Sequence, residues 1–267
     1  MIKARFVHIP KTAGTTVLSI MNLQYPCAAK FVFSRSWEEN ITRWNELSDS
    51  EKSKLRIISG HVPLQTGIQT IDEAPSFTIL RDPMQRAASF CRHALDPKKG
   101  HYLWEKGIRD LDTLLDNPVR ELRNLQTKIL VNPPGATADD AFLDGCDHSE
   151  ILAKAKMVLT DQLVAFGLQE KFDQSMVHIA RAFGWRPPVY LTQNQSDRSM
   201  LVDFTPDQLA KLEALNALDI ELYDFAQQRF QQEVANSDWL DGEMKRFRRW
   251  QGLARPLLKL QKSLRRG

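Results

Sequence analysis

The stretch FVHIPKTAGTTV, residues 6–17, carries the residue types that hold phosphate. An apolar segment runs into a short loop, Pro10–Gly14, and then into Thr hydroxyls at the start of a helix. Such a strand–loop–helix junction aims backbone amides and a helix N-terminus at one point, which makes an anion site. Lys11 adds positive charge, and Gly14 lets the backbone approach a ligand closely. The candidate phosphate-binding residues are Lys11, Thr12, Ala13, Gly14, Thr15 and Thr16.

The order of residues in this loop differs from that of the common nucleotide loop, G-x-x-x-x-G-K-[ST]. Lys11 comes three residues before the only Gly, and no Gly starts the loop. A strand followed by a Gly/Thr turn also occurs in α/β proteins that bind no phosphate. The loop alone therefore predicts an anion site but not which anion.

A second candidate anion site lies in SFTILRDPMQRAASF, residues 76–90. Arg81 directly follows an apolar strand, which is where ligand-facing residues of an open α/β sheet lie. Ser89 lies eight residues further on, about two turns into the next helix, and can return toward the same end. Arg offers a charge-assisted contact and Ser a hydroxyl donor. Arg86 is a candidate third contact, although a surface helix position explains it equally well.

Six histidines are candidates for a general base, because the pKa of imidazole lies near neutral pH. His61 stands out in RIISGHVP, where it follows a short apolar strand and a Gly; a hydrogen bond that ends the strand is its alternative role. His8 lies in the strand that enters the loop, where we expect a buried structural role. His93 and His101 follow the second motif and could line an acceptor pocket. The others are expected to be solvated on helices: His148 and His178.

Taken together, these motifs resemble a known family. HIPKTAGTT resembles the 5′-phosphosulfate loop of sulfotransferases, particularly the group that includes heparan sulfate 2-O-sulfotransferase and its bacterial relatives. Those enzymes use 3′-phosphoadenosine 5′-phosphosulfate (PAPS), on a fold related to nucleotide kinases. Arg-Asp-Pro followed by Arg and Ser is similar to the family's 3′-phosphate motif, with Arg81 and Ser89 on the binding positions. SGHVP resembles the Gly-His pair that carries the base. Weaker similarity extends the resemblance over roughly residues 4–233.

The resemblance implies transfer of the sulfuryl group of PAPS to an acceptor hydroxyl, on a carbohydrate or a small alcohol. Lys11 would neutralise charge on the leaving phosphate and His61 would deprotonate the acceptor, by analogy with phosphoryl transfer. No metal is expected, because Lys11 and the loop amides supply the positive charge. Asn124 and Gln126 are further candidate ligand contacts, although amide side chains on a helix are usually solvated. The segment Thr192–Met200, which is rich in hydrogen-bond donors, could form a cofactor-facing loop.

Two other functional classes stay open at this point. A nucleoside-triphosphate-dependent kinase of the same fold class would need a Lys directly before Ser or Thr at the end of the loop, which is missing, and an acidic metal ligand, for which Asp82 is ambiguous. A non-catalytic nucleotide- or glycan-binding protein could keep the pocket without the chemistry. The acceptor is unassigned, because residues 24–54 and 96–116, where acceptor recognition would be expected, show no similarity to a known acceptor-binding segment.

The order of the strands and helices that must position these residues predicts a three-layer α/β fold. We expect strands at Ala4–Ile9, Leu55–Ser59 and Ser76–Leu80, and at residues 157–160 and 163–168. Helices alternate with them, so the central sheet should be mostly parallel and flanked by helices, as in the P-loop NTPase-like sulfotransferase fold. The expected helices cover residues 15–22, 84–95, 111–116, 119–131, 149–156, 171–183 and 206–235, while residues 24–54 are irregular or helical.

Charge divides the 267-residue chain into a body, residues 1–243, and a basic extension, residues 244–267. The extension holds nine Lys and Arg and no acid, which leaves 27 bases against 33 acids in the body. This mildly acidic body argues against a nucleic-acid binder. After Pro256 the extension could form a basic amphipathic helix that contacts an anionic membrane, a glycan or a partner subunit, or it could be a solvated helix end.

The three cysteines have no CxxC spacing, which argues against a disulfide framework or a zinc site. The N-terminus has no apolar signal region and no run reaches transmembrane length, so we expect a cytoplasmic protein, with peripheral membrane contact through the basic extension as an option.

Overall fold

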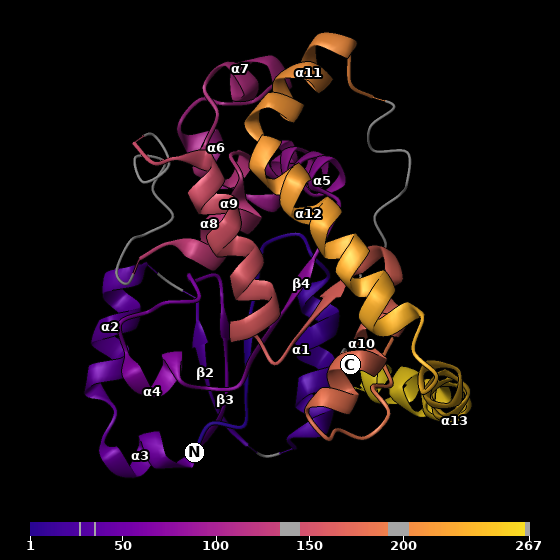
Figure 1. Cartoon of the computed structure of the whole chain (residues 1–267). Coiled ribbons are helices and arrows are strands. Elements are labelled where there is room, and N and C mark those ends of the chain that lie inside the picture. The colour runs from indigo at the N-terminus through magenta and orange to yellow at the C-terminus, as the bar shows by residue number, and fades with distance from the viewer. Residues whose placement is uncertain (27, 35, 134–144, 192–202, 265–267) are drawn as a thin grey trace.

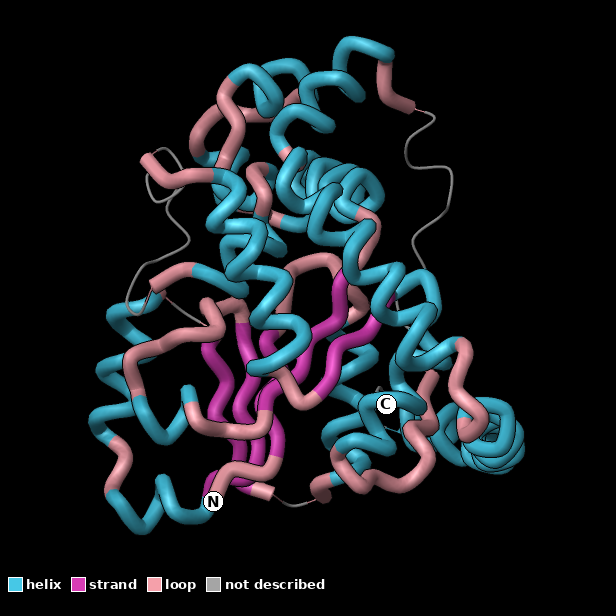
Figure 2. The backbone as a smooth tube through the Cα atoms, viewed as in Figure 1, coloured by secondary structure: helices cyan, strands magenta, loops and turns pink. Residues whose placement is uncertain are grey.

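The computed structural model describes residues 1–26, 28–34, 36–133, 145–191 and 203–264, with the backbone alone for 261–264. Five strands form one sheet in the order β2-β3-β1-β4-β5, and all neighbouring pairs are parallel. The strands are β1 (Ala4–Val7), β2 (Ala29–Phe33), β3 (Leu55–Gly60), β4 (Ser76–Leu80) and β5 (Ala165–Leu168). Figure 2 shows the helices arranged around this sheet.

Helices cover both faces of the sheet, which confirms the predicted three-layer α/β fold. Alternate residues of β1 face opposite sides: Phe6 packs with α1 (Gly14–Gln24) and α10 (Phe172–Ala182), whereas Val7 faces the other core. That second core contains residues of α8 (Leu125–Val131), α9 (His148–Met157) and α12 (Ala217–Phe230). The central strands are therefore buried on both faces, as parallel strands usually are.

The remaining elements surround this frame (Figure 1). Near β2 and β3 lie α2 (Trp37–Glu46), α3 (Asp49–Lys54) and α4 (Gln69–Asp72). Above the sheet in Figure 1 lie α5 (Pro83–Leu95), α6 (Tyr102–Glu105), α7 (Leu111–Asp116) and α11 (Pro206–Leu215). The chain also forms 3-10 turns at Pro97–Lys99, Arg120–Leu122 and Gln169–Lys171, and π-helical turns at Val158–Gln162 and Gln231–Ala235.

Several predicted boundaries were wrong. Residues 157–160 are not a strand, because the end of α9 and a π-helical turn occupy them; a short apolar run cannot distinguish a strand from a buried helix end. The predicted helix over 119–131 is interrupted at Asn124, whose φ of 43° is left-handed. The helix predicted to reach residue 235 is divided at Asn216. Strand β2 was missed within residues 24–54.

The C-terminal segment forms one long helix, α13 (Leu240–Leu264), with Pro256 inside it. It begins before the predicted division at residue 243, and its first turns pack onto the body through Leu240, Met244 and Phe247. None of the helices within the described ranges has the length and apolar character needed to cross a bilayer.

Candidate functional site

The predicted phosphate loop joins β1 to α1 and has an unusual backbone. Lys11 and Ala13 have φ values of 72° and 64°, a region that costs free energy for residues with a side chain. The hydroxyl of Thr12 donates to the carbonyl oxygen of Ile9 at 2.8 Å and so holds the loop from inside. Within the described chain, no side chain caps the N-terminus of α1 and no acid lies in its first turn. The loop therefore presents free amide dipoles of one sign, which suits an anion.

The Thr side chains of the loop differ in what they can contact. Thr12 was predicted to offer its hydroxyl to a ligand, but that hydroxyl is fully buried and used inside the loop. Thr16 is 4% exposed, while Thr15 is solvent-exposed at the start of α1. Lys11 is half-buried; burial lowers its pKa, and the positive charges of Arg81 and Lys99 lower it further. A lysine whose strongest charged neighbours are cations lies in a site that favours an anion.

Gly14 is required by a neighbouring side chain. A Cβ built on Gly14 would lie 1.7 Å from Nε2 of His8, so the imidazole of His8 occupies the space beside the loop. The sequence predicted that Gly14 lets a ligand approach; the structure shows that it lets His8 approach. His8 also stacks on Phe6, with ring centroids 5.0 Å apart. The predicted structural role of His8 therefore includes shaping the loop.

We expect Gly14→Ala to weaken donor binding by at least tenfold and to destabilise the fold by about 1–3 kcal/mol, the usual cost of overpacking. The double variant Gly14→Ala/His8→Ala removes the clashing ring and should recover much of both losses. Calorimetric titration with 3′,5′-adenosine diphosphate (PAP) and thermal unfolding measure the two effects. Gly242→Ala is the control, because its Cβ would meet nothing within 4 Å. Unchanged binding by the single variant would contradict the assignment of the loop.

The two predicted motifs meet in the structure. Nη1 of Arg81 donates to the carbonyl oxygen of Lys11 at 3.1 Å, across a separation of 70 residues. Arg81 is 5% exposed and follows β4, just as the loop follows its neighbour β1. Burial lowers the pKa of Arg81, whereas Glu170 and Asp82 oppose this change. Ser89 is 8% exposed on α5, the helix that begins directly after Arg81 and Asp82.

Arg81 is held from behind by a buried polar network that the sequence did not reveal. Gln126 accepts the amide of Arg81 at 2.9 Å and donates to its carbonyl oxygen at 2.8 Å. The carboxylate of Asp219, fully buried on α12, accepts the amides of Gln126 and Thr127 at 3.0 and 2.7 Å. The loosely predicted contacts at Asn124 and Gln126 are therefore positioning groups here: Asn124 caps α12 through the amides of Leu218 and Asp219.

Arg86 was left open between a ligand contact and a surface helix position, and the surface position is wrong. Its side chain is fully buried on α5, and Nη2 donates to Oδ1 of Asn216 at 3.3 Å. Burial lowers its pKa, which nearby Asp219 opposes. Arg86 thus ties α5 to the junction between α11 and α12.

His61 follows β3 and lies next to the phosphate loop. Its Nδ1 lies 2.9 Å from the carbonyl oxygen of His8, and the two rings have centroids 4.0 Å apart. A carbonyl only accepts, so Nδ1 carries the proton and Nε2 keeps the lone pair when the ring is neutral. Desolvation lowers the pKa of His61, and the bond to His8 partly offsets this. The residue is nevertheless solvent-exposed.

Gly60 allows the turn that presents His61. Its φ of 146° lies outside the usual range of other residues, and a Cβ would lie 2.4 Å from the carbonyl oxygen of Phe33. The prediction that a Gly frees the approach of His61 is consistent with this geometry.

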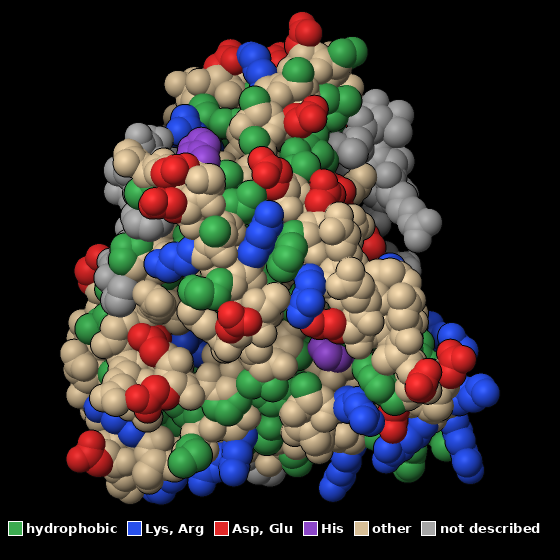
Figure 3. Space-filling view, viewed as in Figure 1, with side chains coloured by type: hydrophobic (Ala, Val, Ile, Leu, Met, Phe, Trp, Pro, Cys, Tyr) green, Lys and Arg blue, Asp and Glu red, His purple; other side chains and the backbone are tan. Residues whose placement is uncertain are grey.

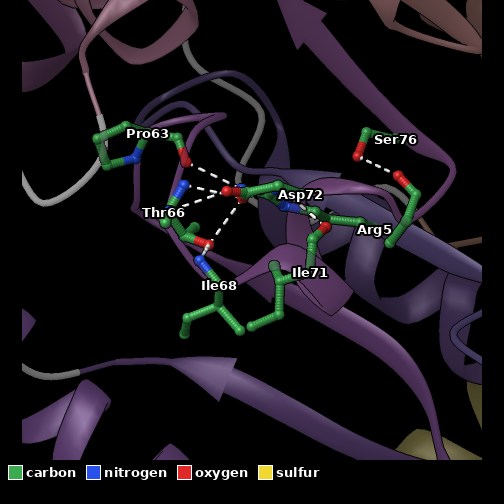
Figure 4. Close-up of polar contacts among 9 residues, drawn as sticks. Arg5, Pro63, Thr66, Ile68, Ile71, Asp72 and Ser76 are labelled. Atoms are coloured by element: carbon green, nitrogen blue, oxygen red, sulfur yellow. Dashed lines mark hydrogen bonds and ion pairs between the residues drawn. The ribbon is translucent and has the colours of Figure 1, made fainter.

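The segment after His61 is anchored to β1 by a partly buried ion pair (Figure 4). Arg5, 1% exposed, contacts Asp72 at 3.3 Å and donates to the carbonyl oxygens of Pro63 and Ile71 at 2.9 and 3.1 Å. Asp72 also accepts the amide and hydroxyl of Thr66 at 2.8 and 2.7 Å. This network fixes the chain two residues beyond His61.

Three further basic or aromatic residues approach the loop. Burial lowers the pKa of His93 and His101, and the charge of Lys11 lowers both further. Lys99 adds to the lowering of the pKa of Lys11 and His93, for which burial is again the first cause. His93 and His101 lie with ring centroids 5.9 Å apart. Their predicted place beside the site is consistent with these interactions. Lys99 was not predicted, because PKK at 97–99 reads as an ordinary solvated turn.

The remaining sequence predictions concern residues outside this site. His148 is exposed at the start of α9, as predicted, but His178 is half-buried and stacks on Trp239, so its predicted solvation was wrong. Cys91 is buried and Cys146 exposed. Thr192–Met200 and Cys27 lie outside the described residues. Over the described ranges, no cluster of three metal-ligating side chains was found.

Comparison with known proteins finds that the chain is similar to sulfotransferases. No protein-family model matches it. It is 24% identical to heparan-sulfate 6-O-sulfotransferase 1-B of Danio rerio, over 91% of this chain and 70% of that protein. It is also 24% identical to heparan-sulfate 6-O-sulfotransferase 2 of Gallus gallus, over 85% and 66%. The chain thus spans about two-thirds of these relatives. A solved structure of mouse sulfotransferase SULT7A1 complexed with PAP has a TM-score of 0.48 at 13% identity, covering 91% of this chain and 88% of that one.

These relatives support the predicted family but not the predicted subgroup. The resemblance pointed to the 2-O-sulfotransferase group, whereas the relatives found carry 6-O names, so the subgroup is not confirmed. The similarity extends over 91% of this chain. The chain is similar to sulfotransferases along most of its length.

Proposed function

We propose that this protein transfers the sulfuryl group of PAPS to a hydroxyl of an anionic glycan, with His61 as the general base. The observation that carries the proposal is the contact between Arg81 and Lys11, which joins two anion-binding motifs at neighbouring strand ends. A donor with a 5′-phosphosulfate and a 3′-phosphate needs two such motifs. The His61 ring borders the same loop through its bond to His8.

Each residue has a distinct part in the transfer. The amides of residues 11–15 and the ammonium group of Lys11 bind the 5′-phosphosulfate, while Arg81 and Ser89 bind the 3′-phosphate. As the acceptor oxygen bonds to sulfur, the bond from sulfur to the bridging phosphate oxygen breaks. Nε2 of His61 takes the hydroxyl proton, and Lys11 stabilises the negative charge that the leaving phosphate acquires.

The acceptor class rests on charge near the loop and on the relatives. Lys99, His93 and His101 interact electrostatically with Lys11, and such a group of positive or protonatable side chains would attract an anionic chain. The relatives are named for heparan sulfate, an anionic polysaccharide. A cytoplasmic location remains a prediction from the sequence.

The kinase alternative is less well supported by the local contacts. Asp82 was its candidate metal ligand, but Oδ1 of Asp82 accepts the amide of Gln85 at 2.8 Å and caps α5. In a non-catalytic binding protein, the lone pair that His61 keeps on Nε2 would have no chemical role.

Calorimetric titration tests the donor assignment directly. PAP should bind at least tenfold more tightly than 5′-adenosine diphosphate, because a buried Arg contact to a charged group contributes about 1.5–3 kcal/mol. Arg81→Ala should abolish this preference, whereas Arg81→Lys should retain part of it. Arg92→Ala is the control, since Arg92 is an exposed arginine on α5, the helix that follows Arg81. Tight ATP binding that ignores the 3′-phosphate would overturn the proposal.

A further inference from the structure

The C-terminal helix α13 has two halves with different surroundings. The first half is fixed to the body: Leu240, Met244 and Phe247 are at most 7% exposed. Gln251 completes this attachment, because its side chain accepts the amide of Tyr190 at 2.9 Å and donates to the carbonyl oxygen of the same residue at 2.6 Å. The second half therefore extends from a rigid support.

The second half carries a row of exposed apolar side chains. Trp250, Leu253, Leu257 and Leu260 are 50%, 62%, 69% and 59% exposed. Their spacings of three, four and three residues put them on one side of the helix, and we call them the apolar stripe. The buried residues of the first half point in another direction, so the stripe does not continue the face that packs on the body. Isolated exposed leucines are ordinary, but an aligned row of exposed apolar side chains marks a surface for interaction.

Positive charge accompanies the stripe. Arg255 and Lys259 lie on the side of the helix opposite the stripe, and both are solvent-exposed. From Met244 to the C-terminus the sequence holds nine bases and no acid. Figure 3 shows Lys and Arg side chains gathered at the lower right of the molecule, where α13 lies in Figure 1. An apolar face with bases on the polar face is typical of helices that lie in a membrane interface.

We propose that α13 docks the protein on a bilayer surface that contains anionic lipid. The apolar stripe enters the boundary between head groups and acyl chains, while the bases contact the anionic head groups. The charge of α13 complements such a surface, and the attachment of its first half would hold the whole body at the membrane. This inference is independent of the donor chemistry proposed above.

Two other partners fit the observations less well. An anionic glycan would satisfy the bases but would leave the four apolar side chains in water. A second copy could cover the stripe, yet residues 250–264 span only about two heptads, fewer than a stable coiled coil needs. Two such helices would also bring nine bases from each copy together.

Vesicle co-sedimentation of the full chain tests the proposal. We expect binding to vesicles of phosphatidylcholine mixed with phosphatidylglycerol, at least tenfold weaker binding to phosphatidylcholine alone, and loss of binding in molar salt. Leu253→Glu/Leu257→Glu should weaken binding at least tenfold. Arg255→Gln/Lys259→Gln should weaken it about fivefold for each base removed. All four positions are exposed, so the variants should keep the thermal stability of the parent.

Matched controls change similar surface residues elsewhere. Leu23→Glu/Met157→Glu replaces two apolar side chains that are 37% and 44% exposed, and Lys3→Gln/Lys54→Gln removes two exposed bases. Neither should change vesicle binding. The proposal is overturned if the chain ignores both kinds of vesicle, or if the controls lose as much binding as the α13 variants. It is also overturned if heparin binds through Arg255 and Lys259 while vesicles do not, or if the stripe supports a dimer in sedimentation equilibrium without binding vesicles.

Discussion

Replacing His61 with Ala lowers turnover with PAPS by about 10²–10⁴-fold while leaving the affinity for PAP nearly unchanged. This is the usual contribution of a general base. The expectation rests on the hydrogen bond from Nδ1 to the carbonyl oxygen of His8, which leaves Nε2 as the basic atom at the edge of the loop. Single-turnover sulfate transfer from labelled PAPS measures the rate, and titration with PAP measures donor binding separately.

The pH profile gives an independent test of the same group. The base acts when it is unprotonated, so kcat/KM should fall as the pH falls through the pKa of His61. Desolvation lowers that pKa from the ordinary 6.5, so the acid limb of the profile should lie below pH 6.5. In His61→Ala this limb should disappear from the residual activity.

His148→Ala is the matched control for this experiment, since His148 is an exposed histidine at the start of α9. It should keep the parental rate and pH profile. Full turnover in His61→Ala, with donor binding intact, would remove His61 from the mechanism without affecting the assignment of the two phosphate sites.

The parts of the site that could be predicted from sequence are those that depend only on a residue's position directly after a strand. The loop and the segment that begins at Arg81 each follow an apolar strand, and parallel neighbouring strands bring their ends to one edge of the sheet. The sequence therefore placed Lys11 and Arg81 correctly without long-range information. His61 lies near them for a similar reason, because β3 pairs with the other side of β1, and its role as the base stays a prediction.

The parts that sequence could not predict depend on tertiary contacts. Nothing in NLQTKIL indicates that Gln126 turns inward to hold the main chain of Arg81, since that contact spans 45 residues. The steric requirement for Gly14, set by the ring of His8, could not be predicted because it becomes visible only when the loop folds back on β1. Strand β2 was missed because an edge strand buries only Phe31 and Phe33 and therefore gives a weak signal.

Replacing Arg5 with Ala should destabilise the fold by about 3–5 kcal/mol, because removal of one partner leaves buried polar groups uncompensated. The carbonyl oxygens of Pro63 and Ile71 would lose their donors, and Asp72 would lose its ion pair. Burial lowers the pKa of Arg5 to about 10, so the guanidinium is still charged at neutral pH. Urea unfolding followed by circular dichroism measures the loss. Arg56→Ala is the control, because Arg56 is only partly buried and bonds to the nearby carbonyls of Ser53 and Leu55.

The same network should also affect the reaction, because Arg5 fixes Pro63 only two residues beyond His61. A milder variant, Asp72→Asn, keeps one acceptor oxygen and should remain folded at low temperature. In it we expect kcat to fall about tenfold with little change in PAP affinity, since a misplaced base slows transfer without disturbing the phosphate loop. The acid limb of its pH profile should persist, because His61 still acts. A fall in PAP affinity as large as the fall in kcat would show instead that the network supports the loop, and that the position of His61 does not depend on the ion pair.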